Sequence, residues 1–155
     1  MKTLITSLQL QPHPEGGWYR EIFRSPIVLD TARGKRAALT TIFYLLGAGQ
    51  ISRWHVVESD EIWHFYAGTT LELFAYDPST RTFKTYVLGH LASGGQSVAI
   101  IPAGVWQAAR VVSGHALVGC TVAPGFEFSD FRFIADLPNH AGHFMDELKT
   151  YAALL

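Results

Sequence analysis

The chain has 155 residues, enough for one domain with a sizeable core. Hydrophobic residues make up 48% and charged residues only 16%, which excludes a disordered chain and predicts that a partner subunit covers part of the surface. The formal net charge of −1 and the lack of a basic run argue against nucleic-acid binding. No apolar stretch approaches the roughly 20 residues of a membrane span, and we expect neither a signal peptide nor a membrane partner. The one cysteine, Cys120, cannot form an internal disulfide, which agrees with the cytoplasmic location that we expect.

The first and last segments have the periodicity of helices. In residues 2–9 apolar side chains recur at helical spacing, and Pro12 and Pro14 prevent the helix from continuing. Residues 140–155 return to helical spacing after Pro138. We therefore expect a short helix at each end of the chain.

Between these helices the sequence predicts strands. Short segments rich in β-branched and aromatic residues are separated by Gly, Pro, Asp or Ser. They are residues 19–24, 39–46, 52–57, 61–66, 70–76, 83–88, 97–101, 107–111, 116–122 and 130–134. This rhythm is typical of a β-sandwich or β-barrel. Because no repeat, linker or low-complexity segment interrupts it, we expect one domain over residues 1–155.

A histidine and a glutamate stand on neighbouring predicted strands inside a glycine-bounded segment. The segment begins at Gly49, continues through His55 and Glu61, and ends at Gly68. It has the spacing of the first cupin motif, G-x5-H-x-H-x3-E-x6-G, except that Val57 occupies the position of the second histidine. The two ionisable side chains are expected to share a pocket.

A second cupin motif occurs later in reduced form. Pro102 and Gly104 are in place, Gln107 occupies the histidine position, and Val111 occupies the asparagine position. Three other segments carry further signatures: HPEGGWYREIFRS, RWH followed by DEIWHFYAG, and LVGCTVAPGFEFSDF. With these segments nearly the whole chain resembles the cupin-5 family of the cupin superfamily. The resemblance implies an all-β double-stranded β-helix, the cupin jelly roll, usually assembled as a homodimer, with a pocket in the mouth of the barrel.

The resemblance also implies where a metal ion would bind. A cupin metal site takes three imidazoles and one carboxylate, whereas this chain offers His55, Glu61 and the amide of Gln107. An amide oxygen is a weaker ligand than imidazole for zinc, copper or nickel. We therefore expect no cofactor, and at most weak binding of a divalent metal at these three residues.

Strand alternation predicts which side chains accompany the motif residues. His55 shares a strand face with Arg53, which could meet an anionic ligand, while Glu61 shares one with Trp63 and Phe65, which could form an aromatic wall. Tyr19 and Glu21 are further candidates, because the first strand of a cupin often borders the pocket mouth. The remaining histidines, including His13, have no ligand spacing and are expected to be structural.

Three functions fit this pattern, and the sequence leaves them open. The first is a metal-independent isomerase or epimerase of a carbonyl- or sugar-type substrate, in which His55 is the base and Tyr44 or Glu61 the acid. The second is a metal-dependent enzyme at His55, Glu61 and Gln107. The third is a non-catalytic module that binds a small molecule with the same pocket. We expect the first, in a small-molecule-binding homodimer.

Overall fold

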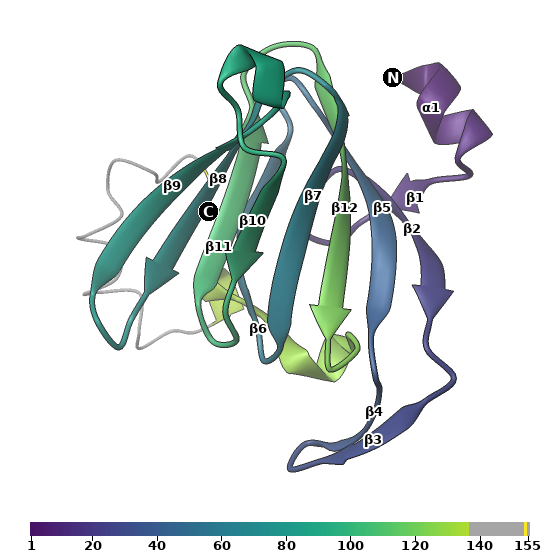
Figure 1. Ribbon diagram of the computed structural model, residues 1–155, viewed down its shortest axis with the longest axis vertical. Helices are drawn as coiled ribbons and strands as arrows, with labels where there is room; N and C mark the ends of the chain where they lie inside the picture. Colours follow the sequence, from purple (N-terminus) through teal and green to yellow (C-terminus); the bar gives the residue numbers. More distant parts are fainter. Residues whose placement is uncertain (137–153, 155) are drawn as a thin grey trace.

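Two β-sheets face each other in the structure, a computed structural model that describes residues 1–136 and 154 (Figure 1). The larger sheet contains, in spatial order, β1 (Gln11–Pro12), β2 (Trp18–Arg24), β5 (Thr40–Gly47), β12 (His115–Ala123), β7 (Asp60–Gly68) and β10 (Val98–Ile101). The smaller sheet contains β13 (Phe131–Phe133), β6 (Ile51–Val57), β11 (Trp106–Val111), β8 (Leu71–Asp77) and β9 (Thr82–Leu88). Neighbouring strands in each sheet pair antiparallel.

Over residues 1–136 the helical structure is slight, and it includes the helix expected at the N-terminus. Helix α1 spans Lys2–Ser7, and Gln9 just beyond it has a left-handed backbone with φ of 54°, which a helix cannot contain. Three single 3₁₀ turns follow, η1 (Leu91–Ser93), η2 (Phe128–Asp130) and η3 (Ile134–Asp136). The helix expected over residues 140–155 lies outside the described residues, apart from residue 154. In the described part of the chain, no helix has the length and apolar character of a membrane span.

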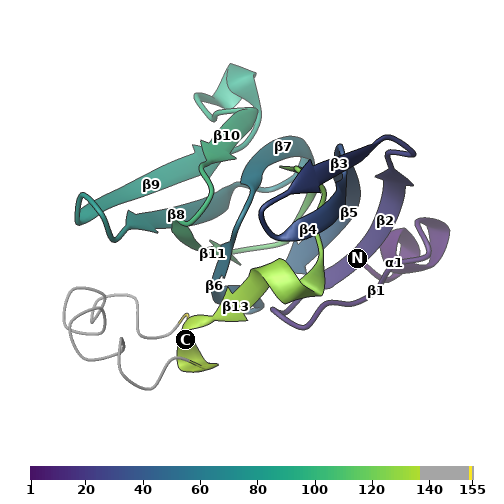
Figure 2. The same cartoon turned by 90° about the horizontal axis from the view of Figure 1, so that it is seen from below.

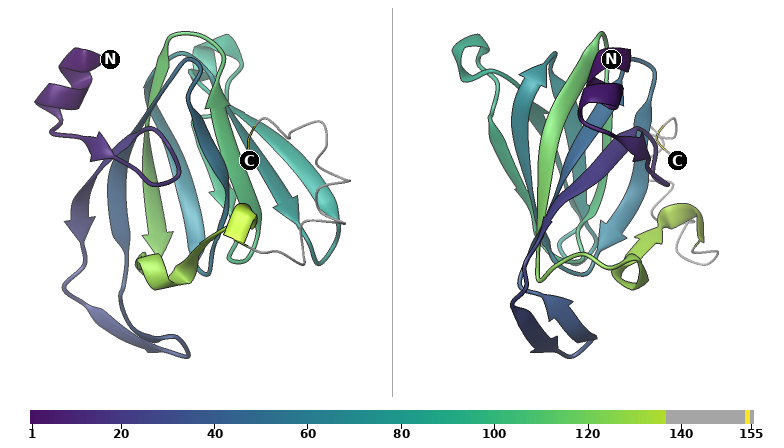
Figure 3. Two further views of the ribbon diagram at one scale, coloured as in Figure 1. Left: turned by 180° about the vertical axis from the view of Figure 1, so that it is seen from behind. Right: turned by 90° about the vertical axis from the view of Figure 1, so that its right-hand side faces the viewer.

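Each predicted strand overlaps an observed one, so the expectation of a mostly β chain is confirmed. The hairpin of β3 (Val28–Thr31) and β4 (Gly34–Ala37) was not predicted from the sequence. That hairpin projects away from the two sheets (Figures 1 and 3) and in the view from below lies in front of β5 (Figure 2); Val28 is 56% exposed. Strands with so little burial lack the alternation of buried and exposed positions on which the prediction depends.

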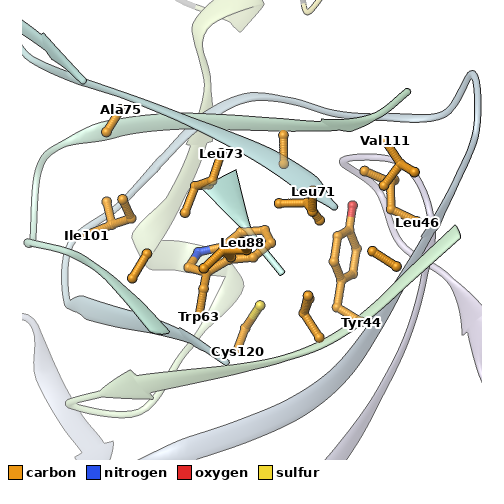
Figure 4. Packing of buried hydrophobic residues seen from close by; sticks show 14 residues of the cluster. Tyr44, Leu46, Trp63, Leu71, Leu73, Ala75, Leu88, Ile101, Val111 and Cys120 are labelled. Atoms are coloured by element: carbon orange, nitrogen blue, oxygen red, sulfur yellow. The ribbon is translucent and has the colours of Figure 1, made fainter. Parts of the chain in front are cut away.

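A buried cluster fills most of the space between the sheets. It combines Tyr44 and Trp63 with aliphatic side chains of both sheets and the thiol of Cys120 (Figure 4). A second buried cluster, which includes Trp54 and Trp106, covers the other face of the five-stranded sheet. The core between the sheets does not reach the end of the molecule at which β6 finishes and β7 starts, and the cavity described below opens there.

Candidate functional site

A cavity opens between the sheets beside this core. Its ionisable lining consists of His13, Glu15, His55 and Glu61. The rest of the lining is mainly apolar, and is formed by Tyr19, Ile42, Val57, Val122, Phe126 and Phe131, with Thr40 and Cys120 between them. About 460 Å³ of atom-free space lies in the cavity when the open solvent at its mouth is included.

A tight loop after β1 brings His13 and Glu15 into the cavity. Gly16 has a φ of +115°, and a Cβ at this position would lie 2.0 Å from the backbone oxygen of Ile51. Only glycine therefore lets the loop lie against β6. The backbone N–H of Arg53 then donates to the backbone oxygen of Glu15 at 2.9 Å, which fixes the loop to this strand.

The carboxyl group of Glu15 lies between two imidazole rings. Its Oε2 is 3.3 Å from Nε2 of His55 and 3.6 Å from Nδ1 of His13, and its Oε1 accepts a hydrogen bond from Ser52 at 3.0 Å. All of these groups are shielded from solvent, with Glu15 itself only 6% exposed. The carboxyl group is therefore held on one side by a hydroxyl and faces ring nitrogens on the other.

Both ring nitrogens that face Glu15 are acceptors when the rings are neutral. Nδ1 of His55 lies 2.7 Å from the backbone oxygen of Arg53 and must carry a hydrogen to bond it, which leaves Nε2 without one. Nδ1 of His13 accepts the backbone N–H of Glu15 at 3.3 Å. Three acceptors at these distances repel one another unless a proton lies among them. A proton on any one of Glu15, His55 and His13 would therefore be shared among the three groups.

Burial determines where this proton resides. Loss of water raises the pKa of Glu15, opposed by the charge of His13. Loss of water also lowers the pKa of His55, and the charge of Glu61 opposes this shift. It lowers the pKa of His13 as well, and there the charge of Glu15 opposes the shift. Each shift favours an uncharged group, so burial moves the preference for the proton from the two rings toward the Glu15 carboxyl group.

The second carboxylate, Glu61, is held from behind by a chain of two hydrogen bonds. Nε2 of Gln107 donates to Glu61 Oε2 at 2.5 Å, and Nε1 of Trp63 donates to Gln107 Oε1 at 3.0 Å. Burial is the main cause that raises the pKa of Glu61 to about 6, with a further contribution from Glu15 and opposition from His55 and Gln107. Near pH 7 the group is mainly a carboxylate, with a proton affinity suited to acid–base chemistry.

The structure brings together only part of the predicted site. His55, Glu61 and Tyr19 line the cavity, and Gln107 is buried behind Glu61 rather than in the lining. Trp63 lies inside the core (Figure 4), and its ring N–H reaches Gln107 instead of the cavity.

The expected aromatic wall has a different composition. Phe65 packs against the core and meets the ring of His90 edge-on at 5.0 Å, so it does not line the cavity. Phe131 takes this place, stacked on His55 with ring centroids 5.1 Å apart. It comes from the segment that follows β12, which strand alternation along β6 and β7 could not identify.

The prediction that Arg53 shares the cavity face with His55 is wrong because of a β-bulge in β6. Gln107 pairs with His55 and Ala109 pairs with Ser52, so β6 has one residue more than β11 between these pairs. The bulge reverses the alternation of side chains between the two faces of β6. Ser52 rather than Arg53 therefore points to the face on which Glu15 lies. The Arg53 guanidinium donates to the backbone oxygen of Pro14 at 2.6 Å and lies 4.3 Å from the ring centroid of Phe133.

Two other candidates also lie away from the lining. Tyr44 is fully buried, and its hydroxyl donates to the backbone oxygen of Gly16 at 2.9 Å. Burial raises the pKa of Tyr44 well above its usual value, so this hydroxyl is a structural donor for the loop. Glu21 is exposed and forms an ion pair with Arg24 at 2.9 Å.

Sequence reasoning missed His13 and Glu15. Both stand in HPEGGWYREIFRS, and the two adjacent glycines were the available signal, because consecutive glycines permit a loop to pack closely against other backbone. His13 was judged only by whether it has the sequence spacing of a metal ligand, and this criterion does not detect residues that a loop brings into a site. The loop places them in the site, and no motif on the strands includes them.

The residues at the cupin metal positions do not fit a metal ion. Nε2 of His55 faces Glu15, the amide oxygen of Gln107 accepts from Trp63, and Val57 lines the cavity with an aliphatic side chain. Only the carboxylate of Glu61 remains as a ligand from these four positions. Over residues 1–136 and 154, no three His, Cys, Asp or Glu side chains are grouped as a metal site requires.

Comparisons with known proteins agree on a family. A family model described as the cupin superfamily (DUF985) matches residues 2–134. An uncharacterized protein of Saccharomyces cerevisiae is 28% identical over 152 residues, which cover 86% of this chain and 75% of that protein. A solved structure from Shewanella oneidensis is 33% identical, with a TM-score of 0.81 and coverage of 96% of this chain and 94% of that one. Oxalate decarboxylase from Bacillus subtilis, 16% identical with a TM-score of 0.63, shares the fold over 89% of this chain and 35% of its own.

Proposed function

This chain belongs to the Cupin_5 family of the cupin superfamily, as its sequence motifs predicted, and from that membership we propose that it binds a small molecule and moves a proton within it. The reaction is the isomerisation or epimerisation of a carbonyl compound, carried out by the side chains of the cavity without a metal ion. The two facing sheets then constitute the double-stranded β-helix of a cupin, with the cavity as its open end.

One observation carries the proposal. The Glu15 carboxyl group faces ring nitrogens of His55 and His13, an arrangement suited to sharing one proton, and the Glu61 carboxylate lines the same cavity. The cavity therefore contains a proton donor and a proton acceptor at neutral pH. Isomerisation next to a carbonyl group needs one of each.

The roles follow from the protonation states. Glu61 removes a proton from the carbon next to the carbonyl group, and the electrons of the broken C–H bond form a C=C bond as the carbonyl oxygen receives the proton of the Glu15–His55 pair. Return of a proton from Glu61 to carbon, and of the hydroxyl proton to the pair, completes the exchange. His55, expected from the sequence to be the base, instead belongs to the acid, because its Nε2 faces Glu15.

Exchange of carbon-bound protons with deuterated water tests the proposal directly. We expect the protein to accelerate loss of the α-proton NMR signal of 2-hydroxyacetophenone and of dihydroxyacetone, and the Glu61→Gln variant to lose most of this acceleration. A protein that binds either ketone without exchanging its α-protons would be the non-catalytic module. Exchange that survives in Glu61→Gln would contradict the role of Glu61.

A further inference from the structure

The cavity offers carboxyl groups to a ligand and no ammonium or guanidinium group. We infer that its ligand is an amine-bearing carbonyl compound, with one protonated amine on an apolar or aromatic body. This inference rests on the proposed function, since it names the substrate class of the same site. Charge, lining and geometry each support it.

Charge is the first support. Among the residues that the structure describes, no lysine or arginine lines the cavity; the Arg53 guanidinium contacts Pro14 and Phe133, and its charge is the smallest of the causes that act on the pKa of Glu15. The ionisable lining consists of two carboxyl groups and of two imidazoles whose pKa values burial lowers, which favours a negative charge over a positive one. A protonated amine balances this charge.

The surroundings of Glu61 are the second support. This residue is 7% exposed, and its carboxylate accepts hydrogen bonds from two uncharged groups, the amide of Gln107 and the thiol of Cys120. A buried carboxylate without a cation is costly, and a ligand cation reduces that cost. An anionic ligand would increase it, so the cavity selects against carboxylates and phosphates.

The walls are the third support, and they specify the body of the ligand. Tyr19, Phe126 and Phe131 line the cavity together with the aliphatic Ile42 and Val122. Aromatic rings attract a cation at their faces and accept an apolar or planar body between them. A small hydrophilic cation alone would leave this surface unused.

Three probes of the same shape and different charge test the inference. Benzylamine is a cation, benzyl alcohol is neutral and benzoate is an anion, and the affinity of each is measured by titration calorimetry or by NMR at pH 7.5. A charge-assisted hydrogen bond is worth about 1.5–3 kcal/mol, so we expect benzylamine to bind at least about tenfold tighter than benzyl alcohol, and benzoate to bind most weakly. Benzoate or benzyl alcohol binding as tightly as benzylamine overturns the inference, and so does a lack of benzylamine binding in the millimolar range.

A matched pair of variants locates the effect. Glu61→Gln keeps the size of the side chain and removes its charge, and should abolish the preference for benzylamine while leaving benzyl alcohol unaffected. Glu72→Gln, in an exposed ion pair with Arg110 on the smaller sheet, should change neither affinity. If the Glu61→Gln variant still binds benzylamine more tightly than benzyl alcohol, the inference is overturned, even if the wild-type protein binds the three probes in the expected order of affinity.

These results can be separated from the proton-transfer test. Proton exchange on neutral ketones without a preference for benzylamine would retain the proposed reaction and reject the amine. Benzylamine preference without exchange on any ketone would retain the amine site and reject the reaction.

Discussion

Oε2 of Glu15 and Nε2 of His55 lie 3.3 Å apart, and both side chains are buried. Glu15 comes from the loop after β1 and His55 from β6, so the contact joins two parts of the chain that share no strand pairing. Because Nδ1 of His55 is bound to a backbone carbonyl, this contact is favourable when one proton lies between the two groups.

Removing either member of this pair should have the same effect as removing both. The Glu15→Gln and His55→Ala variants should each slow ketone proton exchange by about 100-fold or more, and the double variant by no more than the slower single one, because the two groups act through one proton. Exchange rates by NMR check this. His90→Ala, an exposed histidine outside the cavity, is the control. If the loss of exchange rate in the double variant equals the product of the losses in the two single variants, the two groups act independently and share no proton.

Glu61 should make stability depend on pH in a recognisable direction. Its pKa is about 6 in the folded protein against 4.5 in an unfolded chain, so the folded state binds the proton more tightly and stability falls as pH rises through this window. The loss is about 2 kcal/mol. The free energy of unfolding of Glu61→Gln should therefore rise relative to wild type by about 2 kcal/mol between pH 4 and pH 7. Urea unfolding at several pH values measures it, and a constant difference would contradict the raised pKa.

Restoring the missing histidine of the first cupin motif should create affinity for a metal ion. Val57 lines the cavity on the same strand as His55, so Val57→His adds an imidazole near Glu61. We expect this variant to bind Ni²⁺ or Zn²⁺ measurably more tightly than the parent in calorimetry on untagged protein. Val87→His, which adds an imidazole at an exposed position of β9, is the control. Equal affinities in Val57→His and the parent would mean that position 57 does not face Glu61 as a ligand must.

The ion pair between Arg36 and Asp130 should support the cavity wall from outside. Arg36 in β4 donates to both carboxylate oxygens of Asp130, at 2.8 and 2.7 Å, and Arg33 donates to the same carboxylate at 2.6 Å. Asp130 precedes Phe131, so Asp130→Asn should lower both thermal stability and benzylamine affinity although residue 130 does not line the cavity.

The pH dependence of that variant supplies a second test. Arg36 is the main cause that lowers the pKa of Asp130, so the stabilisation is present above the unfolded value of 3.8 and is lost as the pH falls through the lower folded value. The difference between Asp130→Asn and wild type should therefore shrink in strong acid. Glu58→Gln, which breaks a more exposed pair with Arg132, should change stability little at any pH.

We expect the protein to be a homodimer, with the β3–β4 hairpin in the interface. Ile27, Val28 and Phe23 are between 50% and 64% exposed on and beside this hairpin, a cost that a partner surface would remove. Sedimentation should give a dimer at micromolar concentration, and Ile27→Asp should give a monomer. Val112→Asp, at a position 72% exposed in the turn between β11 and β12, should remain dimeric. A monomeric wild type would contradict the prediction.

The sequence was sufficient for the strands because their signal is local. Burial on alternate positions and turn residues between them are visible in any short window, and each predicted strand overlaps an observed one. The same local signal identified His55 and Glu61, which stand on the consecutive strands β6 and β7 in the two facing sheets. It did not extend to β3 and β4, whose side chains are mostly exposed.

The rest of the cavity depends on contacts that no local pattern contains. Arg53 was misplaced because a bulge in β6 changes the side of the sheet on which each residue lies, and a bulge leaves no clear mark in the sequence. Glu15 and Phe131 reach the cavity through a loop and through the segment after β12, which pack against β6 from opposite ends of the chain. Their positions follow from tertiary packing.

The loop that carries His13 and Glu15 lies outside the strand ladders that hold His55 and Glu61. Its attachment to β6 combines the backbone hydrogen bond from Arg53 and the absence of a side chain at Gly16 with the hydrogen bond from Ser52 to the Glu15 carboxyl group. Under the proposed function, the acid is thus assembled from a loop and a strand, whereas the base stands on a strand alone. Substitutions at residues 13 and 15 would then change the acid and leave the base in place, which makes this loop the natural position at which to redesign the chemistry.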